Sequence, residues 1–450
     1  MSKGMKMINN KIWISLACFL IPILGISQPL LEKSAAVKLA LEQNYNLQMV
    51  NNQLEIAKNN TDIFNTGYLP TVSANAGGTL DFGGTKITFA DGHVQDVSAA
   101  ATQRYNASLG ANYVIYDGKR RYYNLENLKV ARSIAELNVR QSVEGVLLQL
   151  FSAYYEVAKV TLDVKAQEET MEVSKKRLQR AQYQFDYGQG SRLNVLNAEV
   201  DINRDSINYR NLVRLLANTK RNLNVILNNR IINEFVVDTT VLYTEGLSLE
   251  DLITKSKSNN VDLLIAEQGI YQSNYTLKQF EANKMPTVST NLSYGWNLTD
   301  NPLSDNPNPF QTDLIRSNGL NLGVTASWNI FDGGTTRTQV QNAKISIMTQ
   351  ELNKASLDQA VERDVLNAWE TYQNALFVLK AEEKNLETNQ LNFSFTEDQF
   401  QIGQVSSVEY RQAQLNLLNA QRSYNQAKFD AKILELNLLQ LSGDLIGAQY

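Results

Sequence analysis

The chain has 450 residues, a formal net charge of −4 at pH 7 and 43% hydrophobic residues, which is the composition of a folded protein with more than one structural unit. It has no basic excess, and no basic patch or run of lysine and arginine suggests a nucleic-acid partner. Cys18 is the single cysteine and His93 the single histidine. These two residues supply neither a disulfide framework nor a multi-histidine zinc site. We therefore expect no metal, no cofactor and no enzymatic activity.

The N-terminus has the pattern of a targeting segment. Three lysines among the first eleven residues precede an apolar stretch at 12–26, and small residues stand just before Gln28. This order predicts a cleaved secretory signal peptide over 1–27. Two alternatives stay open, namely a membrane anchor, for which the apolar stretch is short, and lipid attachment at Cys18 in place of that cleavage.

Three short motifs occur twice, at an offset of 215 or 216 residues. Such a fixed offset indicates a tandem duplication of one structural unit. The first repeat is predicted over 28–245 and the second over 246–450. The paired motifs are Asp117-Gly118 with Asp332-Gly333, Gly188 with Gly403, and Pro70-Thr71-Val72-Ser73 with Pro286-Thr287-Val288-Ser289.

Each repeat begins with two stretches of alternating apolar and polar residues. The alternation predicts strands at about 71–82 and 105–116 in the first repeat, and at about 287–298 and 319–331 in the second. The polar segments between them, 81–104 and 299–318, are expected to be loops, and His93 is expected to be a surface residue of the first.

Two long stretches in each repeat follow a helical period. Neither glycine nor proline occurs between 335 and 402, and Gly145 is the one interruption between 119 and 187. We expect long helices at about 119–187, 190–228, 335–402 and 404–442. Their apolar residues step by three and four, which requires a facing helix and predicts coiled-coil packing. The clearest series is Val361, Val365, Ala368, Tyr372, Ala375 and Leu379, with Val146, Leu150, Ala153, Val157, Val160 and Val164 as its counterpart.

One of these seams is interrupted by polar residues. Asp205 and Thr219 fall at seam positions of the helix predicted at 190–228. We interpret them as weakening that seam. The segment 228–248, between the repeats, is expected to form a small collar around the middle of the helical region.

The strands allow two interpretations. Clean alternation fits half-buried strands of a soluble sheet, and it also fits strands of a transmembrane barrel with one lipid face and one watery face. Aromatic residues near the strand ends, such as Trp296 and Trp328, favour the membrane. Four strands cannot close a barrel, and an open sheet edge is not tolerated in hydrocarbon, so several copies have to combine their strands.

Taken together, these motifs resemble the TolC-type outer-membrane efflux proteins. The resemblance covers 30–445 and depends on the duplication, on Pro-Thr-Val before each first strand, on Phe331-Asp332-Gly333-Gly334 and on the turns around Gly188 and Gly403. It implies an α+β membrane protein whose three copies form a 12-stranded outer-membrane barrel continuous with a coiled-coil tunnel in the periplasm. It also implies passive export of drugs, small molecules or proteins, in partnership with a periplasmic adaptor and an inner-membrane pump of the RND or ABC type.

The resemblance carries over to residues at the helix tips. Family members turn there with a glycine, then a small or hydroxyl residue, then an aliphatic residue, and this turn meets the adaptor. The matching residues here are Gly188, Ser191 and Leu193 in the first repeat, and Gly403, Ser406 and Val408 in the second.

Acidic residues just after the tip narrow the closed pore in the family. The matching positions are Asn194, Asn197, Glu409 and Gln412, of which Glu409 alone is charged, so a strongly acidic gate is not expected. Arg411 could pair with Glu409 or with another helix. A secreted coiled-coil scaffold or adhesin is the alternative function, but it leaves the four alternating strands unexplained. A periplasmic adaptor explains the duplication less well.

Overall fold

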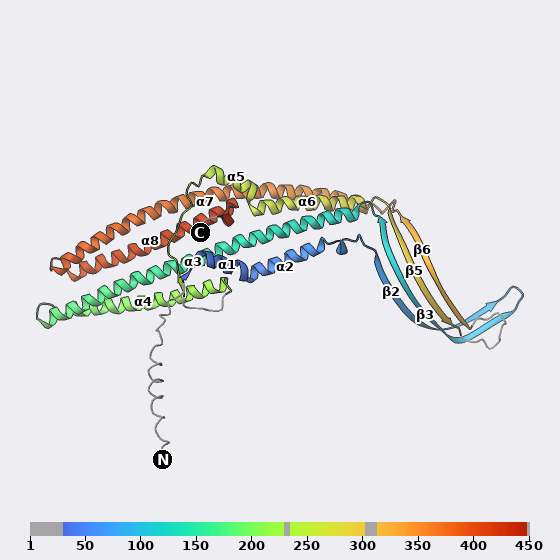
Figure 1. Ribbon diagram of the computed structural model, residues 1–450, viewed down its shortest axis with the longest axis horizontal. Coiled ribbons are helices and arrows are strands. Elements are labelled where there is room, and N and C mark those ends of the chain that lie inside the picture. Colours follow the sequence, from blue (N-terminus) through green and yellow to red (C-terminus); the bar gives the residue numbers. More distant parts are fainter. Residues whose placement is uncertain (1–29, 229–234, 302–312, 448–450) are drawn as a thin grey trace, which may run out of the picture.

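The computed structural model describes residues 30–228, 235–301 and 313–447, and shows an elongated molecule with a curved sheet at one end and long helices at the other (Figure 1). The predicted signal peptide and the prolines at 302, 307 and 309 lie outside the described residues. The first repeat contains β1 (Leu30–Leu31), α1 (Lys33–Gln43), α2 (Tyr45–Asn60), β2 (Thr71–Thr88), β3 (Val94–Tyr116), α3 (Arg120–Asp186) and α4 (Arg192–Ile226). The second contains β4 (Val236–Val237), α5 (Leu249–Asn259), α6 (Val261–Ala282), β5 (Thr287–Asp300), β6 (Leu314–Ser327), α7 (Thr335–Gln401) and α8 (Ser407–Ser442).

The four long strands form one antiparallel sheet in the order β2-β3-β5-β6. The predicted loop at 81–104 is wrong, because β2 and β3 continue as a two-stranded arm in which Phe82 pairs with Ala101 and Thr88 with Val94. A tight turn at Gly92, which has a φ of 83°, closes this arm. Sequence polarity suggested a loop there, but a ribbon that extends past its neighbouring strands does not need an apolar face. The predicted loop at 299–318 is also too long, because β5 continues to Asp300 and pairs there with Leu314, the first residue of β6. β6 ends at Ser327 rather than 331, because its partner β5 begins at Thr287, opposite that residue.

The register places apolar side chains on a single face across all four strands. One row joins Val72, Ala111, Leu292 and Leu322, and the next joins Ala74, Leu109, Tyr294 and Leu320. The opposite face carries Asn, Ser, Thr and Gly. Leu320 and Leu322 are 70% and 71% exposed, so no other described residue covers this apolar face. A sheet with one apolar and one polar face is what a barrel between lipid and water requires.

The long helices pack in pairs. α3 and α7 each have 67 residues, about 100 Å at the α-helical rise. α4 returns along α3 and α8 returns along α7, forming two hairpins, α3/α4 and α7/α8 (Figure 1). Val146, Leu150 and Val157 are fully or almost fully buried, as the predicted coiled-coil seam requires.

Two helices precede the strands in each repeat, and the sequence prediction missed them. The missed pairs are α1/α2 and α5/α6. Asn44 caps α2 and donates its Nδ2 to the Ile226 carbonyl at the end of α4, at 3.1 Å. Asn260 caps α6 and makes the same bond to Leu441 of α8, at 3.0 Å. These bonds join two shorter helices end to end, so that α2 and α4 together run alongside α3, and α6 and α8 together run alongside α7.

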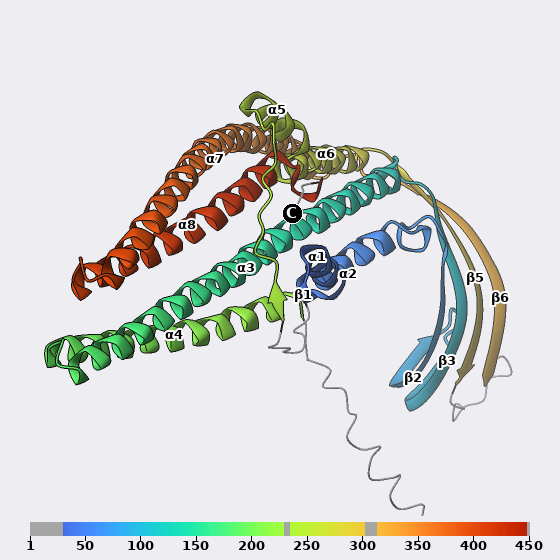
Figure 2. The same cartoon turned by 60° about the vertical axis from the view of Figure 1, so that its left-hand side comes forward.

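The segment 235–248 forms a strap across the middle of the helices (Figure 2). β4 pairs in parallel with β1, and the Tyr154 hydroxyl accepts from the Asp238 amide and donates to the Leu31 carbonyl. Further along, the Glu435 carboxylate of α8 accepts from the amide and hydroxyl of Thr244. The strap thus attaches to both hairpins. A collar around an assembled tunnel stays a prediction.

The helices follow the same lateral order as the strands. Beside the sheet the order is α2, α3, α6, α7, and beyond the strap it is α4, α3, α8, α7. The unpaired edges of the sheet, β2 and β6, therefore lie on the same sides as the outer helices α2/α4 and α7.

Candidate functional site

The candidate site is the end of the molecule farthest from the sheet, where the two hairpins turn. Gly188 and Gly403 have φ values of 72° and 79°. No heavy atom lies within 4 Å of the position a Cβ would take at either glycine. The left-handed backbone, and not lack of space, is therefore the reason for glycine at both turns.

The serines predicted for adaptor contact are N-caps. The Ser191 hydroxyl accepts from the Asn194 amide at 3.3 Å, and the Ser406 hydroxyl accepts from the Glu409 amide at 3.2 Å. In return, the Ser406 amide donates to the Glu409 carboxylate at 2.7 Å, which completes a capping box. Leu193 and Val408, 64% and 72% exposed, leave an aliphatic side chain open beside each turn.

The four gate candidates lie on the surface of the tips. Asn194, Asn197, Glu409 and Gln412 are all exposed, and Gln412 donates to Asn416 one turn along α8 at 2.8 Å. The hydrogen bond from the Ser406 amide lowers the pKa of Glu409 below its ordinary value. Glu409 therefore has a structural role in the cap, and its role in a gate stays a prediction.

A buried ion pair, which the sequence analysis did not predict, joins the two hairpins just behind the tips. Arg411 of α8 donates from both Nη atoms to the two carboxylate oxygens of Asp205 on α4, each at 2.7 Å. The Ser174 hydroxyl donates to the same carboxylate at 2.6 Å, and Gln414 accepts from Arg411 at 2.9 Å. Asp205 is 1% and Arg411 6% exposed.

This pair corrects the interpretation of Asp205 as a weak point in a seam. The carboxylate is buried with a bidentate arginine and a hydroxyl, so it forms a strong contact between the hairpins. The sequence showed a charge at a seam position and an arginine with several possible partners, which is part of what is needed to predict this ion pair. It could not supply the pairing, since Asp205 and Arg411 belong to different repeats.

Two arginines on α3 form hydrogen bonds with the turn of the α7/α8 hairpin. Arg177 forms an ion pair with Asp201 of α4 and donates to the Ser407 carbonyl of α8 at 3.3 Å. Arg180, one turn further along, donates to the Gln401 carbonyl at 3.0 Å, and its guanidinium lies 4.6 Å from the centre of the Phe400 ring. The two arginines thus contact α7 and α8 on either side of the turn at 402–406.

Polar contacts continue along the two hairpins toward the strap. Arg422 donates to Gln167 at 2.8 Å, and Asn425 donates to Asp163 at 2.9 Å. Burial raises the pKa of the Asp163 carboxyl. We call this line of contacts the inter-hairpin seam, formed by Asp163, Gln167, Thr170, Ser174, Arg177 and Arg180 of α3, Asp201 and Asp205 of α4, and Ser407, Arg411, Gln414, Arg422 and Asn425 of α8 with Gln401 of α7.

Inside each hairpin the packing near the tips is apolar. In α3/α4, Ala181 packs with Val195 and Ala198. In α7/α8, the rings of Phe400 and Tyr410 stack with centroids 4.5 Å apart and planes 4° from parallel. Each hairpin therefore has its own apolar contacts, whereas the seam between the hairpins is made of groups that water can also solvate.

The duplication does not extend to the inter-hairpin seam. The counterpart of Arg411 in the first repeat is Leu196, and the counterpart of Asp205 in the second is Ala420. The seam is therefore a property of one pairing of hairpins, α3/α4 with α7/α8 within one chain.

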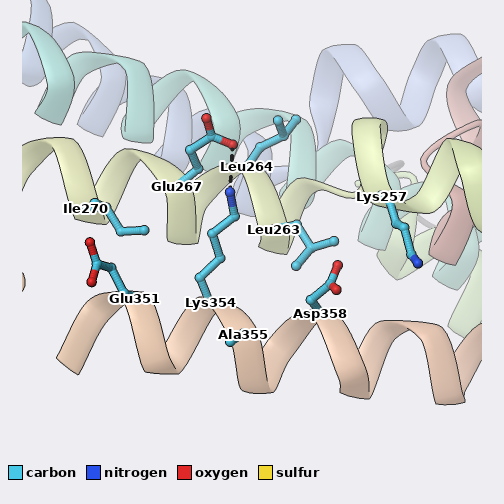
Figure 3. A pocket seen from close by; sticks show the side chains of 9 residues that line it. All are labelled: Lys257, Leu263, Leu264, Glu267, Ile270, Glu351, Lys354, Ala355 and Asp358. Atoms are coloured by element: carbon cyan, nitrogen blue, oxygen red, sulfur yellow. Dashed lines mark hydrogen bonds and ion pairs between the residues drawn. The ribbon is translucent and has the colours of Figure 1, made fainter. Parts of the chain in front are cut away.

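A hollow of about 430 Å³ lies between α5/α6 and α7, away from the tips (Figure 3). Lys354 of α7 pairs with Glu267 of α6 across it at 3.1 Å, and Glu351 and Asp358 flank Lys354 on the same helix. None of the residues predicted from the sequence lines this hollow. Among residues 30–228, 235–301 and 313–447 there is no group of three or more His, Cys, Asp and Glu residues that could hold a metal ion. No helix within these ranges is long and apolar enough to span a membrane.

Comparison with known proteins gives a consistent result. The family model for outer membrane efflux proteins matches the chain twice, over residues 36–229 and 252–444. The outer membrane efflux protein BepC of Brucella suis is 19% identical over 338 residues, 75% of this chain and 72% of BepC. The outer membrane protein TolC of Vibrio cholerae is 22% identical over 306 residues, 67% of this chain and 68% of that protein.

Solved structures share the fold. The CmeC outer membrane channel of Campylobacter jejuni superposes with a TM-score of 0.73 at 17% identity, covering 92% of this chain and 85% of CmeC. The outer-membrane channel OprN superposes with a TM-score of 0.71 at 18% identity, covering 91% of this chain and 89% of OprN.

Proposed function

This chain belongs to the outer membrane efflux protein family, and we propose that it acts as the gated exit duct of an efflux or secretion system. Its sheet lies in the outer membrane and its helices extend into the periplasm. The proposal of a gate is based on the polar inter-hairpin seam. The rest of the assembly follows from the open edges of the chain.

Three copies complete the duct in this proposal. Each chain has a four-stranded sheet with β2 and β6 unpaired at its edges, and a barrel in hydrocarbon has no open edge. The helical layer has its open edges on the same sides. Neighbouring copies therefore complete both layers through one rotation, and three copies give a barrel of 12 strands, within the range of known outer-membrane barrels.

Apolar stripes on the outer helices support this assembly. On α4, Val200 and Ile207 lie seven residues apart and are 64% and 62% exposed. On α7, Ile345 and Leu352 are likewise seven apart, and Phe377 is 72% exposed. A seven-residue apolar spacing requires a facing helix. Among the described residues these stripes have none. In the assembly, the half of α7 beside α6, with Ile345 and Leu352, would face α2 of the next copy, and the half beside α8, with Phe377, would face α4.

The inter-hairpin seam holds the periplasmic end closed in this proposal. Apolar contacts keep each hairpin together, so the hairpins can part as rigid bodies. Closer to the strap the hairpins share apolar contacts such as Tyr155 with Phe429, so the proposed parting is confined to the tip side of these residues. There it exposes charged and amide groups that water solvates. A periplasmic adaptor that binds the tips better when the hairpins are apart would shift the population toward the open duct. The tip residues Gly188, Ser191, Leu193, Gly403, Ser406 and Val408 are the proposed contact, and an inner-membrane pump would act through the adaptor.

Single-channel conductance of the protein in planar bilayers tests the gate. Arg411→Gln leaves the Asp205 carboxylate buried without its partner, a loss of about 3–5 kcal/mol for a buried pair. We expect a several-fold rise in conductance or open probability. The double variant Asp205→Asn with Arg411→Gln restores a neutral amide contact, and its conductance should return toward the wild-type value.

Arg221→Gln is the matched control, because Arg221 is exposed on α4 and bonds to Asn218 of the same helix. Its conductance should equal that of the wild type. Unchanged conductance in Arg411→Gln would show that the inter-hairpin seam is not the gate. Single-channel currents in the same bilayer would separately show whether the protein forms a channel.

A further inference from the structure

The turns that join the sheet to the helices meet at one place on the periplasmic rim. A Cβ built on Gly118, in the turn between β3 and α3, would lie 2.7 Å from the Cβ of Met285, in the turn between α6 and β5. These two turns are therefore in direct contact, although they belong to different repeats. Both lie where the helices meet the sheet (Figure 1).

Lys119 has an unusual backbone for its residue type. Its φ is 70°, in the left-handed region, and its counterpart in the second repeat is Gly334 with a φ of 89°. Glycine adopts this conformation without strain and lysine does not. The first repeat therefore keeps a cationic side chain at a position where the fold favours glycine, and strain of this kind suggests a function for the side chain.

Two more cations belong to the same pair of contacting turns as Lys119. Arg120 is the next residue, and Lys284 precedes Met285 in the contacting turn. All three are exposed, and none has an ion pair within the part of the chain that the structure describes. Glu281, one turn before Lys284, is also exposed and forms no ion pair there. Arg121 differs, because Asp117 neutralises it at 3.2 Å.

Aromatic residues place this cluster at the membrane surface. Arg121 lies 5.2 Å from the ring centre of Tyr68 and 5.7 Å from that of Tyr113, which belongs to the apolar face of the sheet. Trp328, one residue after β6 and 60% exposed, donates its Nε1 to the Lys284 carbonyl at 3.0 Å. Tyrosine and tryptophan gather at the level of lipid headgroups.

We propose that Lys119, Arg120 and Lys284 form a binding site for anionic phospholipid headgroups of the leaflet that faces the periplasm. Cationic side chains beside interfacial aromatic rings attract anionic lipid electrostatically, and each additional cation strengthens the attraction. The acyl chains of the bound lipid lie along the apolar face of the sheet below. This inference depends on the outer-membrane location of the sheet and is independent of the gate and of the adaptor.

Quenching of Trp328 fluorescence by brominated lipid tests the site. The full chain with Trp13, Trp296 and Trp369 each replaced by Phe leaves Trp328 as its only tryptophan. This protein is reconstituted into phosphatidylcholine vesicles that contain brominated phosphatidylglycerol or brominated phosphatidylcholine. We expect phosphatidylglycerol to bind near Trp328 about twofold to fivefold more strongly, and 0.5 M salt, with a Debye length of about 4 Å, to reduce this preference.

Lys119→Gly is the most informative variant. It removes a cation and relieves the left-handed strain, so the preference for phosphatidylglycerol should fall although the fold is not weakened. The triple variant Lys119→Gly, Arg120→Gln and Lys284→Gln should show no preference. Lys380→Gln removes an exposed cation on α7 far from the sheet and should keep the full preference. Equal quenching by both lipids in the unaltered rim, or an undiminished preference in the triple variant, would overturn the proposal.

Discussion

Arginine and carboxylate side chains near the tips have different roles that follow from their burial. Arg411 and Asp205 are buried, and each depends on the other for charge compensation. Glu409 lies six residues after Gly403 and is exposed to water, and it depends on its hydrogen bond with the Ser406 amide. The first pair controls how the hairpins meet, and the second controls how α8 begins.

The capping box should make the start of α8 sensitive to acid. The pKa of Glu409 is lower in the folded protein than in the unfolded chain, so the folded state binds fewer protons. The stabilisation is present above the unfolded pKa of about 4.3 and is lost as the pH falls through the folded pKa. Hydrogen exchange at the first amides of α8 should distinguish wild type from Glu409→Gln at pH 7, and the two rates should converge as the pH falls below the folded-state pKa of Glu409. A ratio that stays constant across this range would show that the carboxylate charge does not stabilise the cap.

Arg180 should set the separation of the two tips. Arg180→Ala removes the hydrogen bond to Gln401 and the contact with Phe400, so the turns at 188 and 403 should move more independently. The mature chain is expected to have no cysteine, so spin labels at Gln189→Cys and Gln404→Cys report their distance. We expect a broader distance distribution in Arg180→Ala and an unchanged one in Lys176→Ala, an exposed neighbour on α3. Equal distributions in both variants would assign the tip separation to other contacts.

At the scale of whole helices, the chain repeats one way of joining two helices end to end. Asn44 and Asn260 each cap one helix with Oδ1 and hold the end of another with Nδ2. The same residue occurs at both places because this joint needs an acceptor and a donor on one short side chain. The joint is inside each repeat, unlike the inter-hairpin seam.

Substitutions at Asn260 should distinguish the contribution of the cap from that of the hydrogen bond to Leu441. Asn260→Asp keeps the cap acceptor and loses the donor to Leu441, so we expect a loss of about 1 kcal/mol in the free energy of unfolding. Asn260→Ala also loses the cap and should cost about 1 kcal/mol more. Urea unfolding of the detergent-solubilised protein measures both losses. Equal stability of the Asp and Ala variants would mean that the cap contributes nothing.

Two glycines with similar backbones should respond very differently to alanine. Gly443 ends α8 with a φ of 76°, and a Cβ there would lie 2.5 Å from the Asn259 carbonyl oxygen. Gly188 has a φ of 72° and open space around it. We expect Gly188→Ala to cost about 1 kcal/mol through its backbone alone and Gly443→Ala to cost more, because the end of α8 would have to move away from α5. Urea unfolding measures both losses. Equal losses in the two variants would show that the end of α8 can move away from α5 without a cost in stability.

At the scale of the whole molecule, the open edges decide the assembly. β2 and β6 lack partners on one side, and the exposed stripes of α4 and α7 lie on the same two sides. The duplication alone does not close the sheet, since two repeats supply four strands. The unit of function is therefore larger than one chain.

Cross-linking should show the size of the assembly. With cysteines at Ser73 on β2 and Thr325 on β6, a short bis-maleimide should join neighbouring copies in membranes into covalent dimers and trimers, and nothing larger. Cysteine at either position alone should give no trimer, because each copy then offers one edge only. Gel electrophoresis under denaturing conditions reads the result. A ladder that ends at dimers or extends past trimers would contradict an assembly of three.

An acidic residue in an exposed stripe should weaken the assembly without unfolding the hairpin. Phe377→Glu places a charge on α7 where the neighbouring copy is proposed to pack, so the trimer should dissociate more readily in detergent. Glu383→Gln, which changes an exposed charge six residues further along α7 and about 120° around the helix from Phe377, is the control. Sedimentation of the purified proteins compares them, and an equally stable trimer in Phe377→Glu would place this stripe outside the interface.

The sequence by itself determined the features that depend on period and on local backbone. Alternation predicted the four strands, three-four spacing predicted the long helices, and the 215-residue offset predicted two copies of one unit. The glycines at 188 and 403 were found because a tight turn needs a left-handed residue wherever it lies. The helices α1, α2, α5 and α6 were missed because they are short and their apolar faces are covered by α3 and α7, which the local pattern does not reveal.

Only the tertiary structure decided which distant residues meet. Asp205 pairs with Arg411, 206 positions away in the chain, and the turn that carries Lys119 contacts the turn that carries Lys284 across two repeats. A charge at a helical seam position is unfavourable until its partner is known, and the partner is set by how two hairpins pack. Local sequence determines the conformation of each element, whereas contacts between elements depend on burial and charge compensation in three dimensions.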